Sequence, residues 1–159
     1  MEARNSETLR LITEEVTDKY KMSYCSVTIE NKLDRRQEFV AATGLSHDSM
    51  HMDQSFATLV IGRDLPIIID SLSTNPRYQD SIVVTGILNA DFYCGTPLIW
   101  KLNEQLQLRA GALCLLDTKA HPEFSLKDTD YLIEKAAEVT NHLKTFNNCP
   151  EHLRSSPAF

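Results

Sequence analysis

Apolar residues recur at helical spacing in two stretches of the chain, one near each end. The first stretch follows Asn5 or Ser6, either of which can cap a helix, and its apolar positions are Leu9, Ile12, Val16 and Tyr20. The second follows Ser125 and Asp128, which have the spacing of a capping box, and its apolar positions are Leu132, Ala136, Val139 and Leu143. The pattern therefore predicts an amphipathic helix at each end of the folded chain.

Between these helices the pattern changes to the alternation that is typical of strands. Residues 25–30 alternate between an apolar face and a polar face, formed respectively by Cys25, Val27 and Ile29 and by Ser26, Thr28 and Glu30. Residues 37–43 can return as the second strand of a hairpin that ends at Gly44. Residues 66–70 are apolar and bounded by turn signals, which indicates a short strand buried on both faces.

Two further strands are predicted in the second half of the chain. In the first of them, over residues 91–98, we expect Gly95 and Pro97 to forbid regular ladder pairing. In the second, we expect one face to carry the even-numbered residues Leu106, Leu108, Ala110, Ala112, Cys114 and Leu116. The residues of its other face change from polar, Gln107 and Arg109, to apolar, Leu113 and Leu115. We therefore expect this face to be covered only in the latter half of the strand.

The segments that connect these strands carry weaker signals. Asp53 or Ser55 can cap a short helix that stops near Gly62 and carries Phe56, Leu59 and Val60. Residues 71–81 have the composition of turns and a short helix. An opening and a closing hairpin, with helices at both ends of the chain, predict an α+β domain built on an antiparallel sheet.

Composition and charge narrow the possible partners. The 159 residues suffice for one domain, and we expect residues 1–146 to fold and residues 147–159 to form a tail or linker. The net charge of −6 argues against attraction to nucleic acid or to an anionic membrane surface. No apolar run approaches the roughly 18 residues of a membrane span, and no signal-peptide core is present. We therefore expect a cytoplasmic protein, or the cytoplasmic part of a larger one.

Few residues of the sequence suggest catalysis or metal binding. It contains no G-x-S-x-G elbow, no phosphate-binding glycine loop and no H-E-x-x-H helix. The histidines, methionines and carboxylates of residues 47–53 have the chemistry to hold copper or zinc, but a solvated loop is the expected state. Cys94 and Cys114 can meet across neighbouring strands as a redox pair, yet neither has a cation nearby in sequence, which favours paired core cysteines without chemistry.

Five motifs between residues 70 and 125 resemble, in order, those of GAF domains. They are Asp70 at a strand end, Asn75 to Tyr78, Phe92 to Leu98, Gly111 to Asp117, and Phe124 with Ser125. The resemblance extends from about Leu9 to Leu143 and is closest to a sensory subgroup found in histidine kinases and related signalling proteins. It implies a central antiparallel sheet of five to six strands, with the terminal helices on one face and a short helix and loops covering a pocket on the other.

The resemblance also implies where a ligand would bind, namely between one sheet face and the segments 53–62 and 70–91. The expected apolar lining consists of Phe56, Val60, Phe92, Leu113 and Leu115, and the expected polar contacts are Asp70, Arg77, Tyr78, Asp91 and Tyr93. Arg77 has the planar fork that suits a carboxylate or phosphate. The alternative is structural: Arg77 fastens its loop by pairing with Asp70 or Asp80, and the tyrosines fill the core.

Several known ligands of GAF domains are not supported by this sequence. The adjacent Cys and His of bilin-binding members are absent from the chain, and the motif of cyclic-nucleotide-binding members is not reproduced. The four cysteines do not match the spacing of the GAF-fold enzymes that reduce free methionine sulfoxide. The ligand therefore stays unidentified.

The resemblance implies a non-catalytic sensory module that binds a small cytoplasmic molecule. Its terminal helices would pass the change to a second copy of the chain, or to a fused output domain, and a homodimer through these helices is expected. Two alternatives stay open. One is a pure dimerisation or interaction module with a degenerate pocket, and the other is a thiol-dependent enzyme of the methionine sulfoxide reductase type.

Overall fold

The computed structural model describes residues 6–45, 49–101 and 103–144, without the side chains of Ser49, His51 and Asp53. Within these residues six strands form one sheet in the order β3-β2-β1-β6-β5-β4, and every pairing is antiparallel. The strands are β1 (Tyr24–Asn31), β2 (Arg36–Thr43), β3 (Ser49–His51), β4 (Ile67–Ile69), β5 (Phe92–Lys101) and β6 (Gln107–Asp117). The predicted α+β fold on an antiparallel sheet is confirmed.

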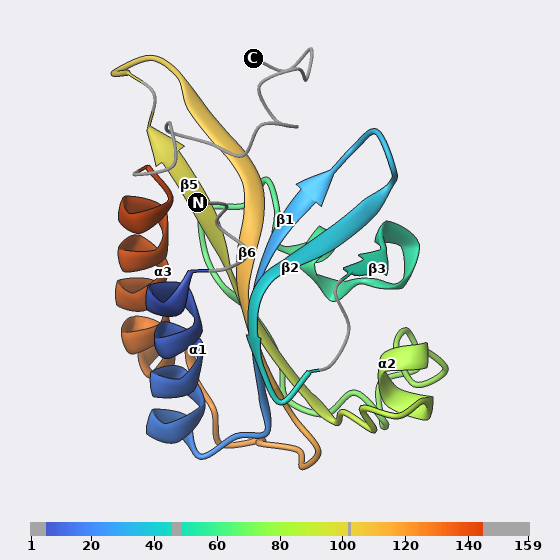
Figure 1. The fold of residues 1–159 in the computed structure, drawn as a ribbon. Helices are drawn as coiled ribbons and strands as arrows, with labels where there is room; N and C mark the ends of the chain where they lie inside the picture. Colours follow the sequence, from blue (N-terminus) through green and yellow to red (C-terminus); the bar gives the residue numbers. More distant parts are fainter. Residues whose placement is uncertain (1–5, 46–48, 102, 145–159) are drawn as a thin grey trace.

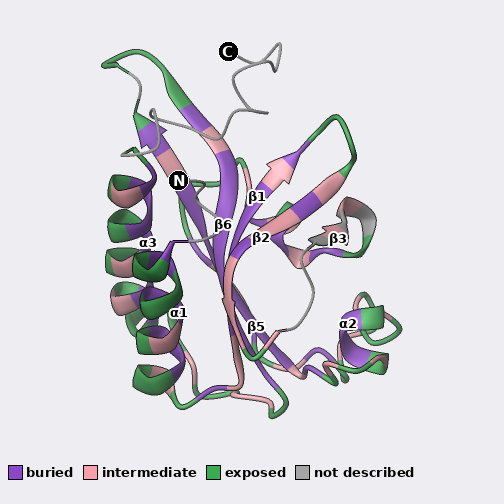
Figure 2. Ribbon diagram, in the orientation of Figure 1, coloured by how far each residue is buried: buried purple, intermediate pink, exposed green. Residues whose placement is uncertain are grey.

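Two long helices lie side by side on one face of the sheet (Figure 1). They are α1 (Glu7–Tyr20) and α3 (Asp130–Leu143), which are the two predicted terminal helices. In the described part of the chain, the helices on the other face are short: η2 (Met52–Gln54), η3 (Phe56–Leu59) and α2 (Ile82–Thr85). Figure 2 shows the central strands buried between these two layers, with exposed residues on the outer sides of α1 and α3.

The two terminal helices are joined to each other as well as to the sheet. The hydroxyl of Tyr20, at the end of α1, donates to the carbonyl of Asp128 at 2.6 Å and accepts from the backbone N–H of Leu132 at 3.1 Å. Lys135 of α3 forms an ion pair with Glu15 of α1. Leu9, Val16 and the other predicted apolar positions of both helices are buried against the sheet, except that Tyr20 is half-buried. No helix in the described part of the chain has the length and apolar character needed to cross a bilayer.

A β-bulge in β6 changes which residues share a face. Leu98 of β5 pairs with Gly111, and the next residue, Ile99, pairs with Arg109, so that Ala110 is the extra residue. Because of this insertion, Leu108 and Ala110 lie in the helix-side core. The other even-numbered residues of the later part, Ala112, Cys114 and Leu116, lie on the opposite face. The prediction that all even-numbered residues from Leu106 to Leu116 share one face is therefore wrong.

The ladder between β5 and β6 is also more regular than predicted. Gly95 pairs with Cys114 and Pro97 pairs with Ala112, within a run of partners that extends from Phe92 to Lys101. On its other side β5 pairs with β4 only from Tyr93 to Gly95, so that Pro97 lies beyond the end of that neighbour. A proline is tolerated there because one side of the strand is not paired with β4. The expectation that Gly95 and Pro97 forbid regular pairing is wrong.

Asp117, the last residue of β6, joins three segments of the chain. One carboxylate oxygen accepts from the backbone N–H and the hydroxyl of Ser23, at 3.2 and 2.7 Å, and from the N–H of Thr118 at 3.0 Å. The other lies 2.6 Å from Nε2 of His121. Burial alone raises the pKa of Asp117, but these hydrogen bonds outweigh it and lower the pKa below its ordinary value. The ionised carboxylate therefore stabilises the junction between β1, β6 and the loop that leads to α3.

We expect Asp117→Asn to lower the free energy of unfolding by about 2 kcal/mol at pH 7, since charge-assisted hydrogen bonds to a buried acceptor are lost. The folded-state pKa is depressed, so this contribution is fully present above the unfolded pKa of about 4 and is lost as the pH falls through the folded value. Urea unfolding at pH 7 and at pH 3 measures both effects.

The matched control for this substitution is Asp80→Asn, because Asp80 is exposed. Its free energy of unfolding should differ from that of the wild type by less than about 0.5 kcal/mol at either pH. Equal losses for the two variants at pH 7 would contradict the role assigned to Asp117.

Candidate functional site

A cavity of about 40 Å³ lies between the sheet and the short helices on the face opposite α1 and α3. Strands β1, β5 and β6 form its floor, and η3, α2 and the loop after α2 form its roof. The lining residues are Ser26, Thr28, Phe39, Leu45, Met50, Ser55, Phe56, Ala57, Val83, Leu88, Tyr93, Cys114 and Leu116. The cavity is thus where the sequence predicted a pocket, under the segments that cross the sheet.

The floor of the cavity brings one thiol and three hydroxyl groups together. Ser26 of β1 pairs directly with Cys114 of β6 in the sheet. The hydroxyl of Tyr93 lies 3.2 Å from the Cys114 sulfur and donates to the backbone carbonyl of Phe56 at 3.2 Å. Thr28 follows Ser26 on the same face of β1, and its hydroxyl lies 3.4 Å from the carbonyl of Ala112. The floor is polar at its centre, and the rest of the lining is apolar apart from Ser55.

Tyr93 and Cys114 are both uncharged at neutral pH. Burial raises the pKa of Tyr93 well above its ordinary value, and the neighbouring Cys114 raises it further. Burial also raises the pKa of Cys114, to about 11, even though hydrogen bonds from Tyr93, Ser26 and Thr28 oppose the shift. The cavity therefore contains a neutral thiol rather than a reactive thiolate.

Aromatic packing and one hydrogen bond hold the roof in place. The ring of Phe56 lies 5.4 Å from the ring of Tyr93 below it and 5.4 Å from the ring of Tyr78 beside it. The hydroxyl of Tyr24 donates to the carbonyl of Leu88 at 2.9 Å and so ties the loop after α2 to β1. The short helix η3 itself begins at Ser55, whose hydroxyl accepts from the N–H of Ala57.

Four of the ten predicted site residues lie in or beside the cavity. Phe56 and Tyr93 line it, Tyr78 packs against Phe56, and Val60 is fully buried in the same apolar cluster. The positions of Tyr93 and Val60 also explain why residue 95 is a glycine. A Cβ atom at residue 95 would collide with the hydroxyl of Tyr93 and would lie 2.7 Å from Cγ2 of Val60. Phe56 and Val60 were predictable from the short helix, Tyr78 from the loop motif of residues 75–78, and Tyr93 from the strand motif of residues 92–98.

Three predicted lining residues belong to the opposite face of the sheet, which is a correction. Phe92, Leu113 and Leu115 are fully buried in the core beneath α1 and α3. Phe92 contacts the rings of His121 and Phe124, each at 5.0 Å. Because side chains alternate along a strand, placing Tyr93 in the cavity places Phe92 against the helices.

The three predicted charged residues lie outside the cavity. Asp91 accepts from the N–H of Ser73 at 2.8 Å, and it thereby holds the start of the crossing segment. Asp70 is exposed and its carbonyl accepts from the N–H of His121 at 2.9 Å. Arg77 is exposed, with its guanidinium carbon 5.6 Å from the ring centre of Tyr78. The predicted pairing of Arg77 with Asp70 or Asp80 is not among the contacts of the described residues.

The sequence analysis did not include several lining residues among its candidates. Ser26 and Thr28 were already assigned to the polar face of a strand, so the alternation there was sufficient to find them. Cys114 and Leu116 could be assigned to the cavity face only if the bulge at Ala110 were known. Phe39, Met50, Val83 and Leu88 come from segments whose pattern does not specify which way they face.

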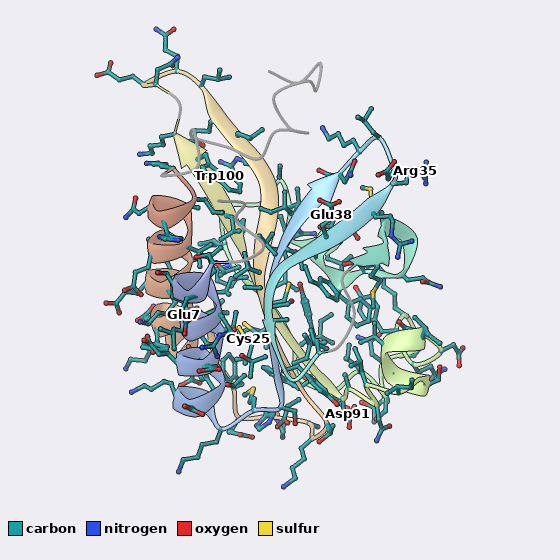
Figure 3. The ribbon with its side chains drawn as sticks, in the orientation of Figure 1. Glu7, Cys25, Arg35, Glu38, Asp91 and Trp100 are labelled. Carbon is teal, nitrogen blue, oxygen red and sulfur yellow. The ribbon has the colours of Figure 1, made fainter. Side chains whose placement is uncertain are left out.

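The cysteines cannot act together in the way the sequence allowed. Cys114 lines the cavity, whereas Cys94 and Cys25 lie in the helix-side core on the other face of the sheet. Figure 3 shows Cys25 on the side of α1, with Trp100 on the same side near α3. The prediction that Cys94 and Cys114 meet as a redox pair is therefore wrong. In the candidate metal-binding loop, residues 47–53, the described part of the chain omits residues 47 and 48 and the side chains of residues 49, 51 and 53, so both histidines and both carboxylates lie outside it.

A second hollow, of about 340 Å³, lies beside the hairpin of β1 and β2. Among the described residues, it is lined by Lys32, Arg35, Met52 and Thr58. Lys32, Arg35 and Thr58 are exposed, so this hollow is open to solvent. The cavity above Tyr93 is more enclosed and is the better candidate for a binding site.

The contact between Gly95 and the cavity floor gives a direct test of this geometry. We expect Gly95→Ala to lower the free energy of unfolding by about 2 kcal/mol, because the added methyl group displaces Tyr93 or Val60. Urea unfolding measures the loss. In a Tyr93→Phe background the nearest colliding atom is gone, so the same substitution should cost less. Strictly additive losses in the double variant would contradict the proposed contact.

The structure is similar to solved domains over most of its length. The GAF domain of a phosphoenolpyruvate-protein phosphotransferase from Acinetobacter matches with a TM-score of 0.66 and 18% identity, over 92% of this chain and 90% of that one. Residues 122 to 287 of a methyl-accepting chemotaxis protein match with a TM-score of 0.67 and 18% identity, over 92% and 91%. Type II free methionine-R-sulfoxide reductase from Thermoplasma acidophilum matches with a TM-score of 0.69 and 14% identity, over 91% and 93%.

The sequence itself matches no family model and no curated protein. The structural matches agree with the fold that the motif series from Asp70 to Ser125 implies. At these identities the similarity establishes architecture and not activity: the chain has the GAF fold.

Proposed function

We propose that this chain is a non-catalytic sensory module, which binds a small molecule in the cavity above Tyr93 and transmits the change to α1 and α3. The observation that carries the proposal is that the cavity and the helices share the same strands. Residues adjacent in sequence, such as Phe92 and Tyr93, face the helices and the cavity respectively. The structural neighbours in a phosphotransferase and a chemotaxis protein support a regulatory role.

The size of the cavity suggests how a ligand would act. Sites for drug-sized molecules have volumes of about 300–1,000 Å³, far more than the 40 Å³ found here. A larger ligand must therefore displace Phe56 or the loop that Tyr24 holds at Leu88. Since a ligand shifts an equilibrium only by its differential affinity for two states, this displacement provides the second state.

The absence of catalysis is part of the proposal. One structural neighbour is a methionine sulfoxide reductase, so a thiol-dependent activity is the enzymatic alternative. Within the described residues only Cys114 lies in the cavity, and burial raises its pKa to about 11. A thiolate is therefore scarce at neutral pH, and no second thiol of the described residues faces it.

The small cavity also favours a second candidate function. The rings of Phe56 and Tyr93 lie 5.4 Å apart and line a cavity of only about 40 Å³, which fits an interaction module whose pocket is degenerate. The two candidates differ in whether any metabolite binds.

Native mass spectrometry of protein incubated with a metabolite extract distinguishes these candidates. We expect a bound mass on the wild type and its loss in Ala57→Leu, where the larger side chain fills the cavity. The matched control is Ala137→Leu, because Ala137 is exposed on α3 and this variant should keep the bound mass. A bare wild-type protein, with no change in melting temperature, would favour the interaction module.

The fluorescence of Trp100 can report whether ligand binding in the cavity affects the helix side of the sheet. Trp100 is the single tryptophan and is fully buried on that side. We expect its emission to shift when a cavity ligand binds, although no ligand in the cavity can touch it. The shift should be absent in Ala57→Leu. Ligand binding without any change at Trp100 would count against transmission through the sheet.

We also propose that the output partner is a second copy of the chain, joined through the outer surfaces of α1 and α3. Leu11 of α1 and Ile133 of α3 support this, because they are the large apolar residues that these helices expose. Sedimentation velocity should find a dimer at high concentration that Leu11→Glu weakens. A strictly monomeric wild type would remove the dimer from the proposal.

A further inference from the structure

The charge of the cavity lining restricts the chemistry of its ligand. Among the described residues that line it, none is an acid or base that is ionised at neutral pH. The two titratable groups, Tyr93 and Cys114, stay neutral because burial raises both pKa values. Of the charged residues that the sequence predicted for the site, Asp91 is engaged with Ser73, and Arg77 is exposed beside Tyr78.

An ionised ligand group would find no compensating charge in this lining. Burying a carboxylate or an ammonium without a partner is far more costly than burying a neutral hydroxyl that is hydrogen-bonded. Glu30 is the next residue after Thr28 on this face of β1. Glu30 does not itself line the cavity, so it does not offer a cation a direct partner.

The polar centre of the floor nevertheless offers hydrogen bonds. The Tyr93 hydroxyl donates to Phe56 and still has lone pairs that can accept, and Ser26 and Cys114 lie beside each other on neighbouring strands. Around this centre the lining is, apart from Ser55, aliphatic, aromatic or thioether, and it includes Met50 and Leu88. The site therefore matches a molecule with one polar group and an apolar remainder.

The volume sets the size of the molecule that fits without rearrangement. A water needs roughly 10–15 Å³ of cavity measured in this way, so 40 Å³ holds only a few atoms, and a cavity that binds benzene measures about 150 Å³. A short aliphatic chain is therefore closer to the available space than a ring. Larger ligands require the roof to move.

We propose that the cavity selects an uncharged, mainly apolar small molecule with one hydrogen-bonding group, which docks against Ser26, Tyr93 and Cys114. This inference rests on the proposed sensory function and specifies its ligand class. It replaces the expectation that Arg77 recognises a carboxylate or phosphate.

The test compares three probes of matched length, n-butanol, butyrate and n-butylammonium, by NMR titration of the ¹⁵N-labelled chain at pH 7. We expect n-butanol to shift the amide signals of Ser26, Tyr93 and Cys114 saturably, with an affinity at least about tenfold higher than that of either charged probe. Ser26→Ala and Tyr93→Phe should each weaken n-butanol severalfold. Arg77→Ala should leave all three titrations unchanged.

The outcomes separate this inference from the proposed function. Equal or tighter binding of butyrate at the cavity amides, or its loss in Arg77→Ala, overturns the ligand class but leaves a sensory cavity. Equal or tighter binding of n-butylammonium likewise overturns the ligand class. If no probe shifts these amides while the wild type retains a metabolite mass, the ligand class is again wrong and the sensor stands. If neither probe nor metabolite binds, both proposals fail.

Discussion

The arrangement of the whole domain depends on the alternation of side chains along β1, β5 and β6, three adjacent strands that are covered on both faces. Each strand contributes one set of side chains to the core beneath α1 and α3 and the other to the cavity. A shift of one residue in the pairing would exchange these two sets, so the register is strongly specified. The bulge at Ala110 is compatible with this register. The even-numbered residues of β6 face the cavity side only from Ala112 onward, and before the bulge Leu108 faces the helices.

Much of this arrangement follows from the sequence, where the signal is local. The terminal helices were predictable because their apolar positions repeat over several turns, and Ser6 does cap α1 by accepting from the N–H of Leu9. The faces of β1 were also predictable, since Cys25 and Ser26 begin a clear alternation. The motifs that resemble GAF domains placed the cavity correctly under η3, and identified Phe56 and Tyr93 as candidates.

The errors have a common physical origin in tertiary contacts that leave no periodic signal. The bulge lies beside Gly111, where an added Cβ would lie 2.7 Å from the carbonyl of Thr28 on the next strand. That close approach is a property of the packed sheet and cannot be seen in the sequence. The sequence alone therefore did not specify which face of the sheet Leu113 and Leu115 occupy. The charged residues were misplaced for a related reason: a sequence specifies that Arg77 is cationic but not that it points outward.

Charge in this domain stabilises the frame and is kept out of the cavity. Asp117 holds the ends of β1 and β6, Asp91 holds the start of the crossing segment, and Lys135 joins α3 to α1. The cavity contains hydroxyls and a neutral thiol instead. A neutral, apolar cavity that shares its strands with two linked helices is well suited to convert a small change in packing into a change in helix arrangement.

The central claim is that events in the cavity reach α1 and α3 through the strands. Amide hydrogen exchange of the chain, with and without a bound metabolite, tests this most directly. The account predicts altered exchange at the amides of α1 and α3, which no cavity ligand can contact. Changes confined to the cavity strands and to residues 52–90 would contradict it.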